Sequence, residues 1–272
     1  MKLFFAGLAT TAAIVGAAAV PAQAASPATT QAAPADAVKA LKAQLLPGKS
    51  VKIDQLSSIT VDFSVDDQAM QVQVNTRTNG TLAFGKGKVA AADLRIRMSS
   101  RQGTEPPYRV VAEGRNAYVT NPGIVKALPA GRSWIGSRTG ERENAILHMG
   151  VTPADLKFML DNSSEVATGE YQGTATLAAY RHDKSAGEGN VEFHLYFDKN
   201  NLLSRAVVDS TSSSDGDAYR QMAFHTDTKY SGWGAKAKIT APASGKVVNE
   251  KKLTPKTRRA VIKAGYPETG PF

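Results

Sequence analysis

Residues Val191–Pro242 read VEFHLYFDKNNLLSRAVVDSTSSSDGDAYRQMAFHTDTKYSGWGAKAKITAP, and within this stretch polar and apolar residues alternate with a period of two. In VEFHLYF the apolar side chains point to one side and the polar ones to the other. The apolar set is Val191, Phe193, Leu195 and Phe197. DKNN supplies turn residues, two further extended runs follow, and AKITAP ends the series. The stretch predicts an antiparallel sheet with one apolar face, which another layer must cover.

The first half of the chain predicts more strands with the same one-sided pattern. Apolar residues alternate with polar ones in the runs 59–65, 70–74 and 92–98, and YRVVAEG with NAYVTN reads as a strand pair around Gly114. Asn79-Gly80 predicts a hairpin turn, because both residues tolerate the positive φ of a tight turn. YQGTATLAAY (171–180) is expected to resume the strands.

Two helices are expected to cover this sheet. The segment 36–46 begins at Asp36, has apolar residues at helical spacing and ends at Pro47-Gly48. The segment 153–161 follows a Thr152-Pro153 start, with threonine as N-cap and proline at the first helical position.

The N-terminus predicts export. A short charged start precedes an alanine-rich apolar run, and Ala22-Gln23-Ala24 is a small-x-small cleavage site, so residues 1–24 read as a secretory signal peptide. Residues 25–35 are expected to form a flexible linker. The chain has no cysteine, which excludes disulfides, thiolate chemistry and an acylated lipoprotein cysteine. We therefore expect a secreted or cell-envelope protein without a lipid anchor.

The chain is basic, with a formal net charge of +9 and a pI near 9.6. Residues 246–272 are expected to form a basic C-terminal tail with a short helix after Thr254-Pro255. This charge favours weak contact with an anionic membrane or wall polymer. An exported protein whose other cations are spread along the chain is not expected to bind nucleic acid.

Motifs for catalysis are weak. GTLAFGKG imitates part of a phosphate-binding loop, but Gly87 stands where a magnesium-binding hydroxyl is needed and TLAF alternates like a strand. His194 and His225 could be drawn as a zinc pair, yet nothing in the spacing supplies further ligands. The chain has no Gly-x-Ser-x-Gly elbow. We expect no enzyme activity, no cofactor and no metal.

Several segments, in their order along the chain, carry a family resemblance. They are GTLAFGKG, EGRNAYVTNPG with LPAGRSWIGS, EYQGTATLAAY, FDKNNLLSRAVV and YSGWGAKAKITAP. Together they resemble the LolA-like fold, in particular the LppX/LprG branch of exported lipoproteins. The resemblance covers most of the mature chain, and the domain is expected to span residues 36–245.

The resemblance implies an α+β fold in which a strongly curved antiparallel half-barrel is covered on its concave face by a few helices. It also implies a lipid or other amphiphile held between sheet and helices. If the family's cleft is transferred to the apolar face of the predicted sheet and the covering helix, the expected lining residues are Val61, Phe63, Val72, Leu94, Ile96, Met98, Leu156, Met159, Phe193, Leu195 and Phe197. One departure is the missing cysteine, since the LppX/LprG branch is tethered through an acylated one.

Three functions remain open at this point. The leading hypothesis is an exported, non-enzymatic carrier or sensor that binds a lipid or amphiphile in an apolar cleft. The alternative is an envelope regulatory or interaction module with a collapsed cavity and a protein partner. The third is a hydrolase whose site the motifs do not reveal.

Overall fold

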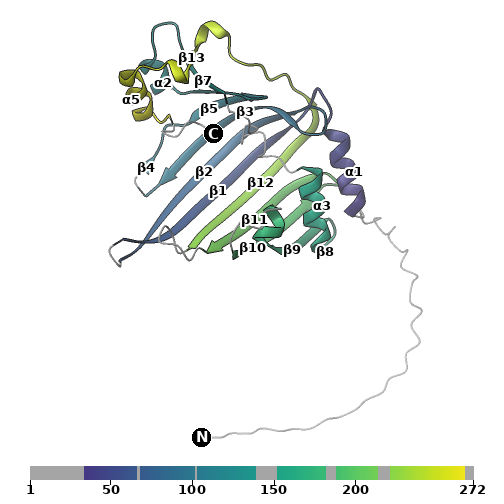
Figure 1. Cartoon of the computed structure of the whole chain (residues 1–272). Coiled ribbons are helices and arrows are strands. Elements are labelled where there is room, and N and C mark those ends of the chain that lie inside the picture. The colour runs from purple at the N-terminus through teal and green to yellow at the C-terminus, as the bar shows by residue number, and fades with distance from the viewer. Residues whose placement is uncertain are drawn as a thin grey trace, which may run out of the picture. The chain divides into compact units, whose positions relative to one another are not determined.

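One large curved sheet dominates the fold (Figure 1). The computed structural model describes residues 34–65, 68–101, 103–138, 152–181, 188–213 and 221–266. The predicted signal peptide and most of the predicted linker lie outside these residues. The strands are β1 (Lys49–Val65), β2 (Gln68–Phe84), β3 (Val89–Ser100), β4 (Gly103–Thr104), β5 (Tyr108–Glu113), β6 (Asn116–Thr120), β7 (Trp134–Arg138), β8 (Ser163–Ala167), β9 (Glu170–Thr176), β10 (Glu188–Phe197), β11 (Leu203–Ser213), β12 (Gln221–Lys236) and β13 (Val247–Asn249).

The strand order is β13-β7-β6-β5-β3-β2-β1-β12-β11-β10-β9-β8, and β4 pairs with β3 beside this path. Every neighbouring pair is antiparallel except β13 with β7, which is parallel. The long central strands β1, β2 and β12 connect the two halves predicted from the sequence. The α+β class and the curved, unclosed antiparallel sheet are confirmed.

The strand registers place most apolar residues of the paired strands on the same side. One row runs from Leu195 through Ala206, Thr228, Gln55, Thr78 and Ile96 to Tyr108. Because side chains alternate along each strand, every second residue from this row lies on the same side. We call this side the inner face. It carries Val51, Ile53, Leu82 and Leu94, all at most 3% exposed.

Helices lie over the two flanks of the inner face. They are α1 (Pro34–Gln44), α2 (Pro122–Ala127), α3 (Pro153–Asp161), α4 (Leu177–Arg181) and α5 (Pro255–Lys263), with short 3-10 turns at Ser244–Lys246 and Glu250–Lys252. In Figure 1, α3 lies in front of β9 to β11 beside α1, and α2 and α5 lie together at the β7 end of the sheet. The centre of the inner face, over β1, β2 and β12, is left between these two groups.

The helix α3 forms where the sequence predicts it. Thr152 caps it through a capping box, in which its hydroxyl accepts from the Asp155 backbone N–H at 3.1 Å and the Asp155 carboxylate accepts from the Thr152 N–H at 3.1 Å. Leu156, Met159 and Leu160 are buried against the sheet. The helix α1 begins two residues earlier than predicted and ends at Gln44, so Leu46 lies beyond it and is 48% exposed.

The predicted hairpin at Asn79-Gly80 is wrong. Both residues lie inside the 17-residue strand β2, where Asn79 pairs with Asp54 and Arg95. Glycine is needed there because of crowding: a Cβ on Gly80 would lie 2.1 Å from the Asp93 backbone oxygen of β3. The turn between β2 and β3 comes later, where the Gly85 N–H donates to the Lys88 carbonyl at 2.8 Å.

Three further segments differ from the sequence prediction. The strand in YQGTATLAAY ends at Thr176, and LAAYR forms α4, in which Leu177 is buried. Residues 237–243 carry no strand, since β12 ends at Lys236. Beyond the predicted boundary at residue 245, β13 extends the sheet and α5 packs against α2, with Val261 and Tyr266 in the core. Val248, Leu253 and Ala264 also pack against this core, so the basic stretch is part of the folded domain.

Candidate ligand-binding cleft

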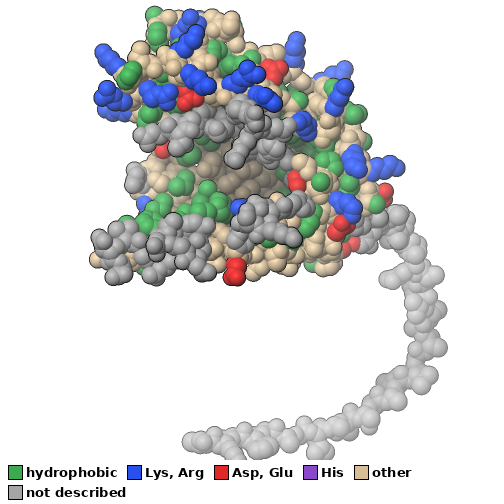
Figure 2. Space-filling model, in the orientation of Figure 1, with side chains coloured by type: hydrophobic (Ala, Val, Ile, Leu, Met, Phe, Trp, Pro, Cys, Tyr) green, Lys and Arg blue, Asp and Glu red, His purple; other side chains and the backbone are tan. Residues whose placement is uncertain are grey.

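The inner face is hollowed at its centre (Figure 2). The hollow is largely tan, the colour of the backbone and of side chains that are neither hydrophobic nor charged, with green hydrophobic side chains beside it. Most blue and red side chains lie around it or above it. The strand register identifies the residues of this floor on β1, β2 and β12, in three successive zones along the strands.

The first zone, nearest α1, is a packed core that we call the closed end. Val51 and Ile53 of β1 face Leu82 of β2, and all three are almost fully buried. Tyr230 of β12 stacks on Trp233, whose ring stacks on Phe84. Burial raises the pKa of the Tyr230 phenol, so this end holds a neutral, tightly packed aromatic group.

The zone farthest from α1 is apolar but incompletely covered, and we call it the open end. Its residues are Ile59, Val61 and Phe63 of β1, Met70, Val72 and Val74 of β2, and Met222 and Phe224 of β12. Three of them are strongly exposed for inner-face residues: Ile59 is 39%, Val72 44% and Met70 48% exposed. A contiguous exposed apolar surface of this kind is typical of a binding site rather than of a finished core.

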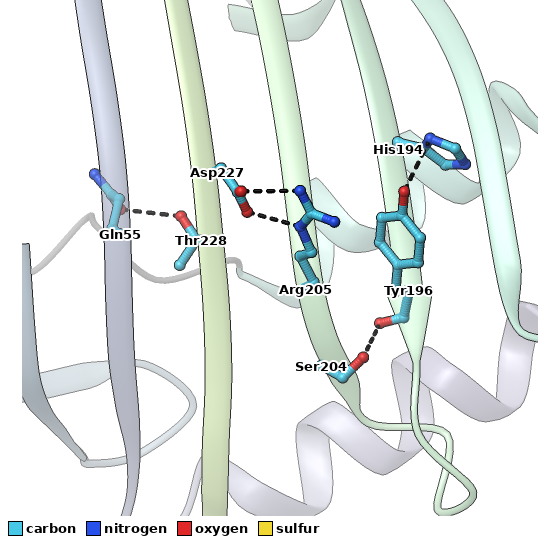
Figure 3. Close-up of polar contacts among 7 residues, drawn as sticks. All are labelled: Gln55, His194, Tyr196, Ser204, Arg205, Asp227 and Thr228. Atoms are coloured by element: carbon cyan, nitrogen blue, oxygen red, sulfur yellow. Dashed lines mark hydrogen bonds and ion pairs between the residues drawn. The ribbon is translucent and has the colours of Figure 1, made fainter.

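The middle zone, which we call the polar band, interrupts the apolar face across three strands. It consists of two rows, Thr228–Gln55–Thr78 and Thr226–Ser57–Thr76, each running across β12, β1 and β2. The Thr228 hydroxyl donates to the Gln55 side-chain oxygen at 3.1 Å (Figure 3). The Gln55 amide donates in turn to the Ser57 hydroxyl at 2.9 Å. Thr78 and Thr228 are only 2% and 3% exposed.

The predicted lining residues separate into these zones. Leu94, Leu156, Met159, Phe193 and Leu195 are at most 2% exposed, and Ile96 is 8% exposed, so all six are in the packed core. Phe197 is partly buried and lies edge-on to Tyr171 at 5.7 Å. Val61, Phe63 and Val72 lie in the open end. Met98 lies beside Thr76 at the margin of the polar band.

A cavity of about 540 Å³ adjoins the open end, where β2 and β3 separate. Val72, Val74 and Met98 supply its apolar lining. The remaining lining is Gly103, polar residues of β2 and β3, and the two charged residues Arg101 and Glu105 on either side of β4. Its volume lies within the range of small-molecule sites, roughly 300–1,000 Å³.

The charged residues of the central strands lie on the outer face, because they occupy the alternate strand positions. Arg205 of β11 forms a bidentate pair with Asp227 of β12, with N–O distances of 2.8 and 2.9 Å (Figure 3). This hydrogen-bonded pair raises the pKa of Arg205 and lowers the pKa of Asp227. The guanidinium also lies 5.3 Å from the Tyr196 ring centre, and the Tyr196 hydroxyl contacts His194 Nδ1 at 3.3 Å.

The two histidines considered as zinc ligands contact different residues and share no partner among the hydrogen bonds described. His194 contacts Tyr196, and His225 contacts Asp209 at 2.7 Å. Within the described part of the chain, no three His, Asp or Glu side chains gather as metal ligands. No described helix is both long and apolar enough to cross a membrane.

Comparisons with known proteins give likenesses of structure alone. No family model matches the chain, and no curated protein matches it. Among solved structures, a LolA superfamily protein from Nitrosomonas europaea is 10% identical, covers 76% of this chain and 95% of its own, and has a TM-score of 0.23.

Two other solved structures are similarly distant. A DUF1329 family protein from Desulfovibrio piger is 14% identical over 73% of this chain and 90% of its own, with a TM-score of 0.20. A porin-like protein from Bacteroides uniformis is 8% identical over 69% of this chain and 97% of its own, with a TM-score of 0.19. The half-barrel description therefore rests on the strand order and register of this chain.

Proposed function

We propose that this protein is an exported, non-enzymatic carrier or sensor that binds a lipid or other amphiphile on the inner face of its half-barrel. The observation that carries this proposal is the open end, where Ile59, Met70 and Val72 are exposed on the concave side of the sheet. An apolar concave surface that the described helices leave uncovered is suited to hold hydrocarbon chains.

Burial of hydrocarbon would drive the binding, at about 25 cal/mol for each Å² removed from water, before the costs of association. This driving force is non-directional. We therefore expect weak discrimination between chains of similar length, and any sharper selectivity must come from polar groups in the cleft.

The test is a charge placed in the open end, compared with the same charge on the outer face of the same strand. Ile59→Asp puts a carboxylate on the inner face of β1. Leu56→Asp is the matched control, because Leu56 is 51% exposed and lies on the outer face of β1. Both sites are exposed, so both variants are expected to fold, as circular dichroism would show.

With a fluorescent acyl amphiphile, Ile59→Asp should bind at least about tenfold more weakly than the wild type, because the new charge must be desolvated. Leu56→Asp should bind like the wild type. Equal binding by all three proteins would refute the open end as the site. Leu195→Arg is unsuitable here, since Leu195 is fully buried in the packed core and the variant is expected to unfold.

Contact with an anionic surface is the second part of the proposal. Six exposed cations surround α5, on the 3-10 turns and the helix itself, and we call them the α5 basic patch: Lys246, Lys251, Lys252, Lys256, Arg259 and Lys263. The acidic residue among them, Glu250, is paired with Arg258 at 3.6 Å. Such a patch supports weak, salt-sensitive attachment to anionic lipid or wall polymer.

The interaction-module alternative predicts a different outcome. A protein that repeatedly binds no amphiphile, but captures an envelope protein in a pull-down, would favour a regulatory role over a carrier.

A further inference from the structure

The polar band has a chemical character that the apolar cleft alone does not explain. Its six side chains, at positions 55, 57, 76, 78, 226 and 228, are hydroxyls and one amide. In the same two rows the flanking strands carry apolar residues: Ala206 and Val208 on β11, and Ile96 and Met98 on β3. Within these two rows the polar groups are therefore confined to the three central strands. Thr78 and Thr228 are buried, whereas Ser57, Thr76 and Thr226 are half-buried.

The inner face also lacks charge around this band. From Val51 to Phe63 on β1, from Met70 to Leu82 on β2 and from Met222 to Tyr230 on β12, no inner-face position holds Asp, Glu, His, Lys or Arg. The same is true of the described inner positions that pair with them on β3 and β11. Charged residues of these strands, such as Asp54, Arg77 and Asp227, occupy outer-face positions instead.

The hydrogen bonds of the band leave it able to bind neutral polar groups. The Thr228 hydroxyl donates to Gln55, and the Gln55 amide donates to Ser57. Ser57 accepts in this chain of bonds, so its own proton can be donated to an ester or hydroxyl oxygen of a ligand. A charged group at the same place would lose hydration and would gain no counter-ion from the described inner-face positions of these strands. That costs far more than burial of a neutral polar group.

Resting on the function proposed above, we infer that the polar band selects amphiphiles whose polar group is uncharged, such as an ester or a polyol, and discriminates against anionic ones. The hydrocarbon chain lies against the open end and the neutral polar group against the polar band. This selectivity opposes the protein's net charge of +9, which attracts anions at long range. A preference for the neutral ligand would therefore reflect the cleft rather than the surface.

The test uses two ligands that share one oleoyl chain and a glycerol backbone. One is 1-oleoyl-glycerol, which is neutral, and the other is 1-oleoyl-glycerol-3-phosphate, which is anionic. Each competes with a bound fluorescent amphiphile in 150 mM salt, so that long-range attraction is screened to about 8 Å. We expect the wild type to bind the neutral ligand at least about tenfold more tightly.

Two variants test whether the polar band causes the preference for the neutral ligand. Thr76→Lys places a cation at the half-buried margin of the band and should bring the anionic ligand to equal or tighter binding. Thr226→Val replaces a hydroxyl by a methyl group of similar size and should weaken the neutral ligand by several-fold, about 1 kcal/mol for one lost hydrogen bond. Thr60→Val, on the outer face of β1, is the matched control and should leave both affinities unchanged.

Each outcome decides a different claim. Equal affinity of the wild type for the two ligands, or tighter binding of the anionic one, would overturn the selectivity and leave the proposed function standing. Failure of both ligands and of the fluorescent amphiphile to bind would overturn the proposed function itself. A preference that Thr76→Lys and Thr60→Val change equally would show that the polar band is not its source.

Discussion

At the scale of single residues, the alternate strand positions separate two chemistries. Inner positions hold apolar groups or uncharged hydrogen-bonding groups, and outer positions hold ion pairs such as Arg205–Asp227. The outer pair stabilises the sheet without placing a charge in the cleft. Its geometry is bidentate, and the Asp227 side chain is only 16% exposed, so it should contribute more than a typical surface pair.

Replacement of Asp227 by asparagine tests this contribution. Because the Arg205 hydrogen bonds lower the pKa of Asp227 in the folded state, its contribution is fully present above the unfolded pKa of about 4 and is lost as pH falls through the lower folded pKa. We expect Asp227→Asn to lower the free energy of unfolding by about 1 kcal/mol at pH 7. Urea denaturation at pH 7 and at pH 3 should show the difference shrinking in acid, whereas a pH-independent difference would contradict the ion-pair account.

At the scale of elements, local sequence signals predicted those parts whose structure is decided locally. The segment 153–161 carries its own cap and apolar stripe, and it forms α3 with the predicted bounds. The hairpin predicted at Asn79-Gly80 was wrong because this dipeptide is compatible with two structures. It suits a tight turn, and its glycine also suits a strand whose neighbour approaches closely. Only the position of the Asp93 carbonyl on β3 decides between them, and Asp93 lies 13 residues after Gly80 in the sequence.

The polar band was missed for a similar reason. In each strand two same-face polar residues interrupt the apolar pattern, as Gln55 and Ser57 do between Ile53 and Ile59. Within one strand alone, such polar residues only make the predicted apolar alternation weaker. The register of three strands is needed to show that the interruptions align. The open and closed ends were likewise inseparable in sequence, since Val72 and Leu94 have the same alternation and differ only in what covers them.

The helix α5 offers a test of surface attachment at this scale. Lys256→Gln with Arg259→Gln removes two charges from the α5 basic patch, and Lys39→Gln with Lys42→Gln removes two exposed charges from α1. Each basic residue near an anionic bilayer contributes about 1 kcal/mol, so the α5 variant should bind anionic vesicles with roughly 30-fold lower affinity. Co-sedimentation with the vesicles measures this affinity. The α1 variant should change little. Equal losses in both would show that net charge, and not this patch, drives attachment.

At the scale of the whole molecule, the sheet is long enough to serve two roles with one set of strands. Near α1 the inner face is packed against helices and supplies stability, as the burial of Val51, Leu82 and Leu195 shows. Toward the tips of β1 and β2 the same face is exposed and apolar. The strands thus extend a stable core into an exposed apolar surface, and the polar band marks the boundary between them.

The central claim is that this surface holds an amphiphile. Native mass spectrometry of the protein purified from its own envelope tests it most directly, because a ligand held in the cleft should travel with the protein. We predict an adduct with the mass of one amphiphile, which is lost from Ile59→Asp and retained by Leu56→Asp. Repeated preparations of the wild type without any adduct, together with no uptake of a fluorescent acyl amphiphile, would contradict the account.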